Sequence, residues 1–136
     1  MPANSTAVFQ TMNDSKPELT ELSDEQRVAL IDDLLSHVWM VRAFLKHCEE
    51  AEEDDDILDV HRGLYDYMLA LGGPLDAGDH AKYLKTAKKK LKRLKAANEL
   101  FTEVQPEVSS HTNFKMAAQS LRIAVAQIIE LIEQPE

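Results

Sequence analysis

The sequence predicts an all-α protein, an antiparallel up-down-up-down four-helix bundle with a flexible N-terminal tail. Four stretches carry apolar residues at spacings of three and four, which is the pattern of amphipathic helices. Only 4 glycines and 5 prolines occur among 136 residues, and most of them lie between those stretches or in the tail. Four such helices with short connections bury their apolar seams against one another as a bundle. The length fits one domain with a sizeable core.

Residues 1–22 form the predicted tail, because they are rich in Ser, Thr and Asn and show no sustained period. The bundle domain then covers residues 23–136. Its first helix begins at Ser23, since Ser23 and Gln26 fit the capping box that satisfies free amides of the first turn. Acidic residues oppose the dipole at a helix C-terminus, so the run 49–56 predicts the end of this helix and the start of the next.

The remaining helices are bounded by turn residues. One of the aspartates 54–56 caps the second helix, and the Gly-Gly-Pro sequence at 72–74 stops it. The third helix spans 79–104, capped by Asp79 and interrupted by Pro106. A serine or threonine at 109, 110 or 112 caps the fourth, whose seam runs from Phe114 to Ile132.

The third helix has a strongly basic back. Eight of the 15 Lys and Arg residues fall between positions 82 and 95, which leaves 7 basic and 24 acidic residues, a formal −17, for the rest of the chain. The predicted basic interaction face consists of Lys82, Lys85, Lys89, Lys92 and Arg93. It could simply be a solvated face, or it could meet an acidic protein partner, including residues 49–56 of a second copy. A second alternative function is weak, salt-sensitive binding of nucleic acid through the basic face of helix 79–104. Nucleic acid is an unlikely partner, because the acidic remainder repels phosphate and no aromatic residues interleave the lysines.

Several apolar residues lie off the helical seams, which predicts a second buried surface. Met116 and Ile123 of the fourth helix belong to this group. Self-association is the simplest source of such a surface, so a homodimer is expected, and folding of the tail over these residues is the alternative. The predicted dimer surface comprises Met40, Phe44, Leu100 and Val104.

Motifs of the familiar enzyme classes are absent from the sequence: it has no phosphate loop, no GxGxxG, no CxxC and no HExxH. The leading hypothesis is therefore a non-enzymatic interaction or assembly module without a cofactor. The runner-up is a metal-binding bundle, which could be an enzyme. In it, His37 and His80 meet at one end of the bundle with Glu130 and hold a divalent metal such as zinc or iron. His61 lies on a seam and is interpreted as a core histidine.

Cysteine usage and hydropathy point to a cytoplasmic protein. Cys48 is the single cysteine, so no intrachain disulfide can form. The first 15 residues are polar and lack the apolar core of a signal peptide. No apolar run approaches the ~18 residues that a membrane-spanning helix needs. We therefore expect no membrane partner.

Overall fold

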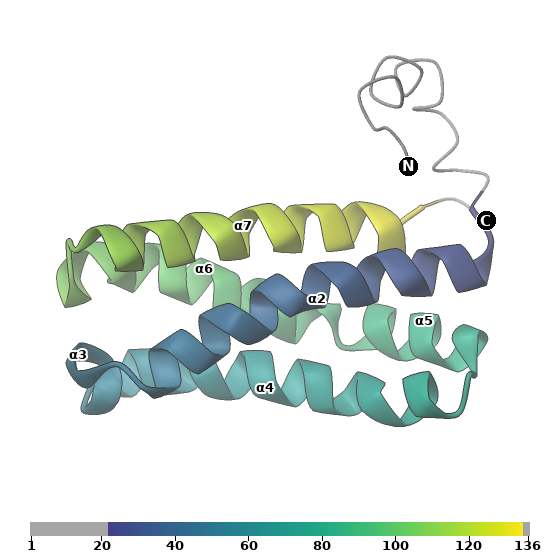
Figure 1. Ribbon diagram of the computed structural model, residues 1–136, viewed down its shortest axis with the longest axis horizontal. Coiled ribbons are helices and arrows are strands. Elements are labelled where there is room, and N and C mark those ends of the chain that lie inside the picture. Colours follow the sequence, from purple (N-terminus) through teal and green to yellow (C-terminus); the bar gives the residue numbers. More distant parts are fainter. Residues whose placement is uncertain (1–21, 135–136) are drawn as a thin grey trace, which may run out of the picture.

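The computed structural model describes residues 22–134, and every regular element within that range is a helix (Figure 1). Five long helices lie along a common axis, and one short turn joins the first two. The predicted tail lies outside the described residues, apart from Leu22. The elements in chain order are α2 (Asp24–Lys46), α3 (Glu49–Glu52), α4 (Asp55–Asp76), α5 (His80–Lys89), α6 (Leu91–Val108) and α7 (Thr112–Ile132).

The start of α2 confirms the predicted capping box. The Ser23 hydroxyl accepts a hydrogen bond from the Gln26 amide at 3.1 Å, and the Gln26 side chain accepts one from the Ser23 amide at 2.9 Å. The end of the first helix that was predicted within the acidic run is misplaced, because α2 ends at Lys46 and the first part of the run forms α3. The predicted new helix does begin at the end of the run. The Asp54 carboxylate accepts from the Ile57 amide at 3.0 Å and caps α4.

The predicted stop at residues 72–74 is wrong, because α4 continues through Pro74 to Asp76. The stop is supplied four residues later by Gly78, whose φ of 68° is the left-handed conformation that favours glycine. The amide of Gly78 donates to the Leu75 carbonyl and the amide of Asp79 to the Pro74 carbonyl, both at 3.0 Å. These two bonds are the Schellman pattern, which satisfies the last carbonyls of the helix.

The single third helix predicted over 79–104 is also wrong, because the backbone breaks at Lys90 between α5 and α6. Asp79 does cap α5, accepting from the Lys82 amide at 3.1 Å. At the break, the fully buried Tyr67 of α4 donates its hydroxyl hydrogen to the Ala87 carbonyl at 2.9 Å. In an unbroken helix that carbonyl would accept from residue 91 instead. A side chain inserted into the hydrogen-bond ladder is a recognised cause of a kink.

Two further helix ends differ from the prediction. Helix α6 runs through Pro106 to Val108 instead of ending before the proline. The cap of α7 is His111, whose ring Nδ1 accepts from the Asn113 amide at 3.0 Å. The predicted Ser or Thr cap is therefore replaced by a histidine that offers the same kind of acceptor. Neither difference moves a seam residue to another face.

The all-helical class is confirmed, whereas the four predicted helices are five long ones. Helix α2 packs against α7 and α4, and α6 packs against the same two helices from the other side. Helix α5 lies against α4 and α2. The core lies between these helices, and its largest fully buried side chains are Tyr67, Tyr83, Phe101, Phe114, Ile31, Ile57, Leu64, Leu94, Leu121 and Ile128. In the part of the chain that is described, no helix has the length and apolar character needed to cross a membrane.

Candidate functional site

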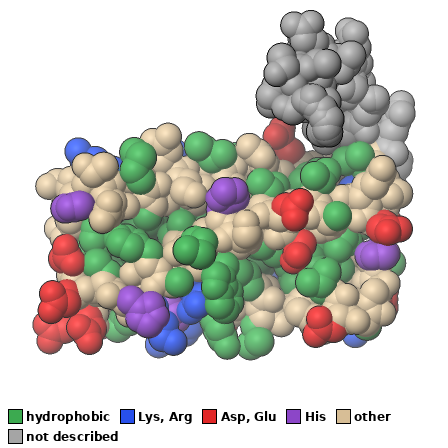
Figure 2. Space-filling model, in the orientation of Figure 1, with side chains coloured by type: hydrophobic (Ala, Val, Ile, Leu, Met, Phe, Trp, Pro, Cys, Tyr) green, Lys and Arg blue, Asp and Glu red, His purple; other side chains and the backbone are tan. Residues whose placement is uncertain are grey.

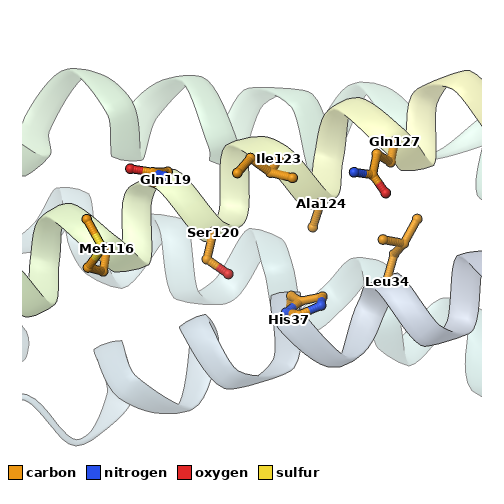
Figure 3. Close-up of a pocket in the computed structure, with 8 residues that line it drawn as sticks. All are labelled: Leu34, His37, Met116, Gln119, Ser120, Ile123, Ala124 and Gln127. Atoms are coloured by element: carbon orange, nitrogen blue, oxygen red, sulfur yellow. The ribbon is translucent and has the colours of Figure 1, made fainter. Parts of the chain in front are cut away.

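An open groove of about 420 Å³ runs between α2 and α7 (Figure 3). Two residues of α2 and six of α7 line it, and none of the eight carries a carboxylate, an ammonium or a guanidinium group. This α2–α7 groove consists of Leu34, His37, Met116, Gln119, Ser120, Ile123, Ala124 and Gln127. An uncharged lining is notable in a chain in which 29% of the residues are charged.

Large apolar side chains at the rim of this groove are exposed. Met116 and Ile123 are two turns apart on α7 and retain 52% and 49% of their accessible surface. Elsewhere on α2, outside the residues that line the groove, Leu30 is 40% and Met40 is 65% exposed. Figure 2 shows hydrophobic side chains spread across the face that α2 and α7 present. A patch of this kind is typical of an interaction surface.

The four residues predicted as a dimer surface differ in their exposure. Met40 is exposed, but Phe44, Leu100 and Val104 are partly buried and pack against the protein's own core. The ring of Phe44 meets Phe114 edge to face, with centroids 5.1 Å apart. The off-seam positions Met116 and Ile123 therefore contribute more exposed apolar surface than these three.

The structure does not bring together the three residues predicted to bind a metal. His37 lines the α2–α7 groove, whereas His80 is the first residue of α5. Helices α2 and α5 begin at the same end of the molecule (Figure 1). His37 lies 13 residues after Asp24, which places it roughly 20 Å along the axis from that end. Within residues 22–134 no three or more His, Cys, Asp or Glu side chains lie close enough together to hold a metal ion. Glu130 is therefore not part of such a group either.

All five members of the predicted basic face are exposed on α5 and α6. Arg93 forms an ion pair and a hydrogen bond with Asp66 of α4. Nearby, the Lys95 ammonium lies 3.6 Å from the Glu133 carboxylate. The other four members, Lys82, Lys85, Lys89 and Lys92, have no ion-pair partner among the described residues. With respect to the described part of the chain, this face thus has four unpaired cations.

A second cluster, which the sequence analysis missed, lies on the other flank of α2 against α4. Arg42 is only 7% exposed, and its guanidinium carbon lies 4.0 Å from the Trp39 ring centre and 5.6 Å from that of Tyr65. Its Nη1 donates to His61 Nε2 at 3.0 Å, since a guanidinium has donors only. We call Trp39, Arg42, His61 and Tyr65 the Arg42 cluster. The sequence did contain an indication of this cluster. Arg42 lies four residues after Val38, on the apolar face of α2, where an arginine is unusual.

The charges acting on His61 in the Arg42 cluster are all positive. Burial lowers the pKa of His61, and the nearby cations Arg42, Lys46 and Arg62 lower this pKa further. The Arg42 Nε–H group is buried without a hydrogen-bond partner. No ion pair is formed by Arg42 in the described structure. The cluster therefore holds a buried cation that no carboxylate of the described residues neutralises.

Arg27 is the other buried arginine of α2, and it is bound in a different way. It is 5% exposed, and it donates from Nε to the Leu131 carbonyl at 3.0 Å. Its Nη2 donates to the carbonyls of Leu131 at 2.7 Å and Ile132 at 3.1 Å. Those carbonyls belong to the last turn of α7, so Arg27 caps that helix.

Comparisons with protein-family models, with curated protein sequences and with solved structures found no match to this chain. Function has to be inferred from the residues and their arrangement.

Proposed function

We propose that this protein is a non-enzymatic interaction module that forms a homodimer through the α2–α7 groove. We also propose that its fold is an up-down-up-down four-helix bundle whose third arm is split into α5 and α6. The observation that carries the functional proposal is the uncharged, apolar groove on the surface of a chain with net charge −9. The sequence-based expectations of a single domain over 23–136 and of a cytoplasmic location belong to the same proposal.

The energetic reason for pairing is burial of apolar surface without desolvation of ions. Removing apolar surface from water is worth about 25 cal/mol per Å². Burying a charge would offset that gain, and the groove lining contains no carboxylate, ammonium or guanidinium group. In a twofold dimer the same patch occurs on both subunits, so every exposed Met116 and Ile123 contributes twice. A second copy also fits because the uncharged groove brings no like charges of the two acidic chains into direct contact.

The unpaired lysines of α5 and α6 support a second, separate contact with an acidic protein. Lys82, Lys85 and Lys89 project from α5 without ion-pair partners in the described range. An acidic segment would meet them with complementary charge, chiefly raising the rate of association. This contact is expected to weaken steeply with added salt, because the lysines are exposed.

The dimer can be tested by measuring solution mass with light scattering or sedimentation equilibrium over a range of concentrations. The wild-type chain is expected at twice its monomer mass of 15.4 kDa. Ile123→Lys places an ammonium group in the groove and is expected to give a monomer. The matched control is Leu69→Lys, since Leu69 is 64% exposed on α4, on the opposite flank of α2. That variant should remain dimeric.

Two results would overturn the dimer proposal. One is a wild-type protein that stays monomeric up to the highest concentration at which it remains soluble. The other is a dimer that Ile123→Lys leaves unchanged, or that Leu69→Lys disrupts equally, because the interface would then lie elsewhere. Circular dichroism of each variant verifies that the helices are retained.

A further inference from the structure

We propose that the Arg42 cluster is a binding site for a small oxyanion, a carboxylate or a phosphate, which pairs with the Arg42 guanidinium between Trp39 and Tyr65. This site lies between α2 and α4, on the flank of α2 away from the α2–α7 groove. It does not depend on the proposed dimer.

The first step concerns the unused hydrogen-bonding capacity of Arg42. A guanidinium has five N–H donors arranged as a planar fork. Here one bond is made, to His61, and the buried Nε–H has no acceptor. A buried cation without a counter-ion is costly, and a buried donor without an acceptor adds to that cost. An oxyanion supplies the missing counter-charge, because its oxygens accept from the Nη groups of the fork and its charge neutralises the cation. The buried Nε–H group lies out of its direct reach and responds to the added charge only.

The second step concerns the charge around the cluster. Arg42 and Lys46 of α2 and Arg62 of α4 all lie close enough to affect the protonation of His61. Arg62 is also paired with Asp59 at 3.6 Å, where both side chains are exposed. Among residues 22–134 no carboxylate forms an ion pair with Arg42. Three cations therefore lie around His61 in a protein of net charge −9, which favours an anion at this place.

The third step concerns the aromatic walls. Trp39 lies over the guanidinium at 4.0 Å, and the rings of His61 and Tyr65 are parallel to within 4° at 6.3 Å. Trp39 and Tyr65 are 47% and 40% exposed, so the cluster reaches the surface although its cation is buried. Rings that cover a cation exclude water from it, and a charge-assisted bond made there is stronger than one made in bulk solvent. Because Trp39 covers the face of the guanidinium, the anion is expected to bind at its edge.

The site carries its own optical probe, since Trp39 is the only tryptophan of the chain. The experiment follows its fluorescence at pH 7.5 while the full-length protein is titrated with inorganic phosphate, with glutarate, or with sodium chloride at matched ionic strength. A saturable change with phosphate, with glutarate or with both is expected, and none with chloride. Phosphate alone would identify a phosphoryl ligand, glutarate alone a carboxylate ligand, and both a general oxyanion site.

Arg42→Lys keeps the charge but removes the fork, so it is expected to weaken binding at least tenfold. The matched control is Arg122→Lys, the same substitution at an exposed position of α7, which should bind like the wild type. A second measurement uses the wild type alone, so that it survives any folding defect of the variant. The assigned NMR resonance of the Arg42 Nε–H group should shift along the same saturation curve.

The proposal is overturned if neither oxyanion gives a saturable change, or if chloride reproduces the change. It is equally overturned if Arg42→Lys binds as tightly as Arg122→Lys, or if the Arg42 Nε–H resonance stays in place while Trp39 responds.

Discussion

Arg27 and Arg42 lie on the same helix and are almost equally buried, at 5% and 7% exposure, but their surroundings differ. Arg27 meets the carbonyls that end α7, which have no partners within their own helix and carry the negative end of its dipole. Arg42 meets a histidine and two aromatic rings, and the cations Lys46 and Arg62 act on that same histidine. The first arginine completes a helix end, and the second retains binding capacity. Burial alone does not tell a structural cation from a site.

The largest expected effect comes from Arg27→Met, which removes the donors from the α7 C-terminus. Two buried carbonyls lose a charged partner, and hydrogen bonds to charged groups are worth about 1.5–3 kcal/mol each. We expect the free energy of unfolding in urea to fall by about 3 kcal/mol with an unchanged m-value. A loss below about 1 kcal/mol would show that water replaces the arginine without penalty.

The second effect compares two fully buried tyrosines, of which one has its polar group hydrogen-bonded and the other does not. The Tyr67 hydroxyl donates to the Ala87 carbonyl, whereas the Tyr83 hydroxyl of α5 has no partner. Tyr67→Phe is expected to lower stability by about 1–2 kcal/mol, because it leaves a buried carbonyl unsatisfied. Tyr83→Phe should be neutral or raise stability by up to about 1 kcal/mol. Equal losses in urea unfolding would contradict this ordering.

The third effect is Arg42→Met, the same substitution as at Arg27. Replacing an uncompensated buried cation by an apolar side chain of similar length is often neutral or stabilising. The lost contacts with Trp39 and Tyr65 work in the opposite direction. We expect stability within about 1 kcal/mol of the wild type. A loss as large as that of Arg27→Met would show that Arg42 is a structural residue and would weaken the oxyanion proposal.

The smallest effect is a pH dependence that comes from His61. Its pKa is lowered in the folded protein by burial and by the surrounding cations, so the unfolded chain binds more protons. The free energy of unfolding is therefore unaffected by His61 above the pKa of an unfolded histidine, about 6.5. It decreases as the pH falls below that value. The raised pKa of Asp32 changes stability in the opposite sense, but in a more acidic range.

His61→Gln keeps an acceptor for Arg42 without a titrating ring. Between pH 7.5 and pH 5.5 the wild-type melting temperature is expected to fall further than that of this variant. Parallel curves for the two proteins would show that His61 does not contribute.

Local features of the fold could be predicted from the sequence, and features that depend on a second helix could not. The cap formed by Ser23 and Gln26 is contained in four residues, and it was predicted correctly. The break at Lys90 depends on Tyr67 of a different helix, so it could not be predicted from the residues of 79–104 alone. The stop predicted at residues 72–74 relied on the two glycines as a left-handed cap and on the proline, but all three lie inside α4, and the positive φ occurs at Gly78.

The candidate sites follow the same division. Periodicity placed Met116 and Ile123 off the seam, and both are exposed. It placed Phe44 off the seam too, yet Phe44 packs on Phe114, because neighbouring helices cover more than one stripe. His61 was interpreted as a core histidine hydrogen-bonded to a neighbour. It is only partly buried, and its partner Arg42 could not be named from the sequence because it belongs to another helix.

The break at Lys90 also bears on the order in which parts of the native protein open. Helix α5 has ten residues, and isolated helices shorter than about 12–15 residues are marginal in water. Since its backbone ladder does not continue into α6, helical order reaches α5 mainly through the packing of Tyr83 and Ala87. Amide hydrogens of α5 should therefore exchange with solvent through local opening, before those of the adjoining α6.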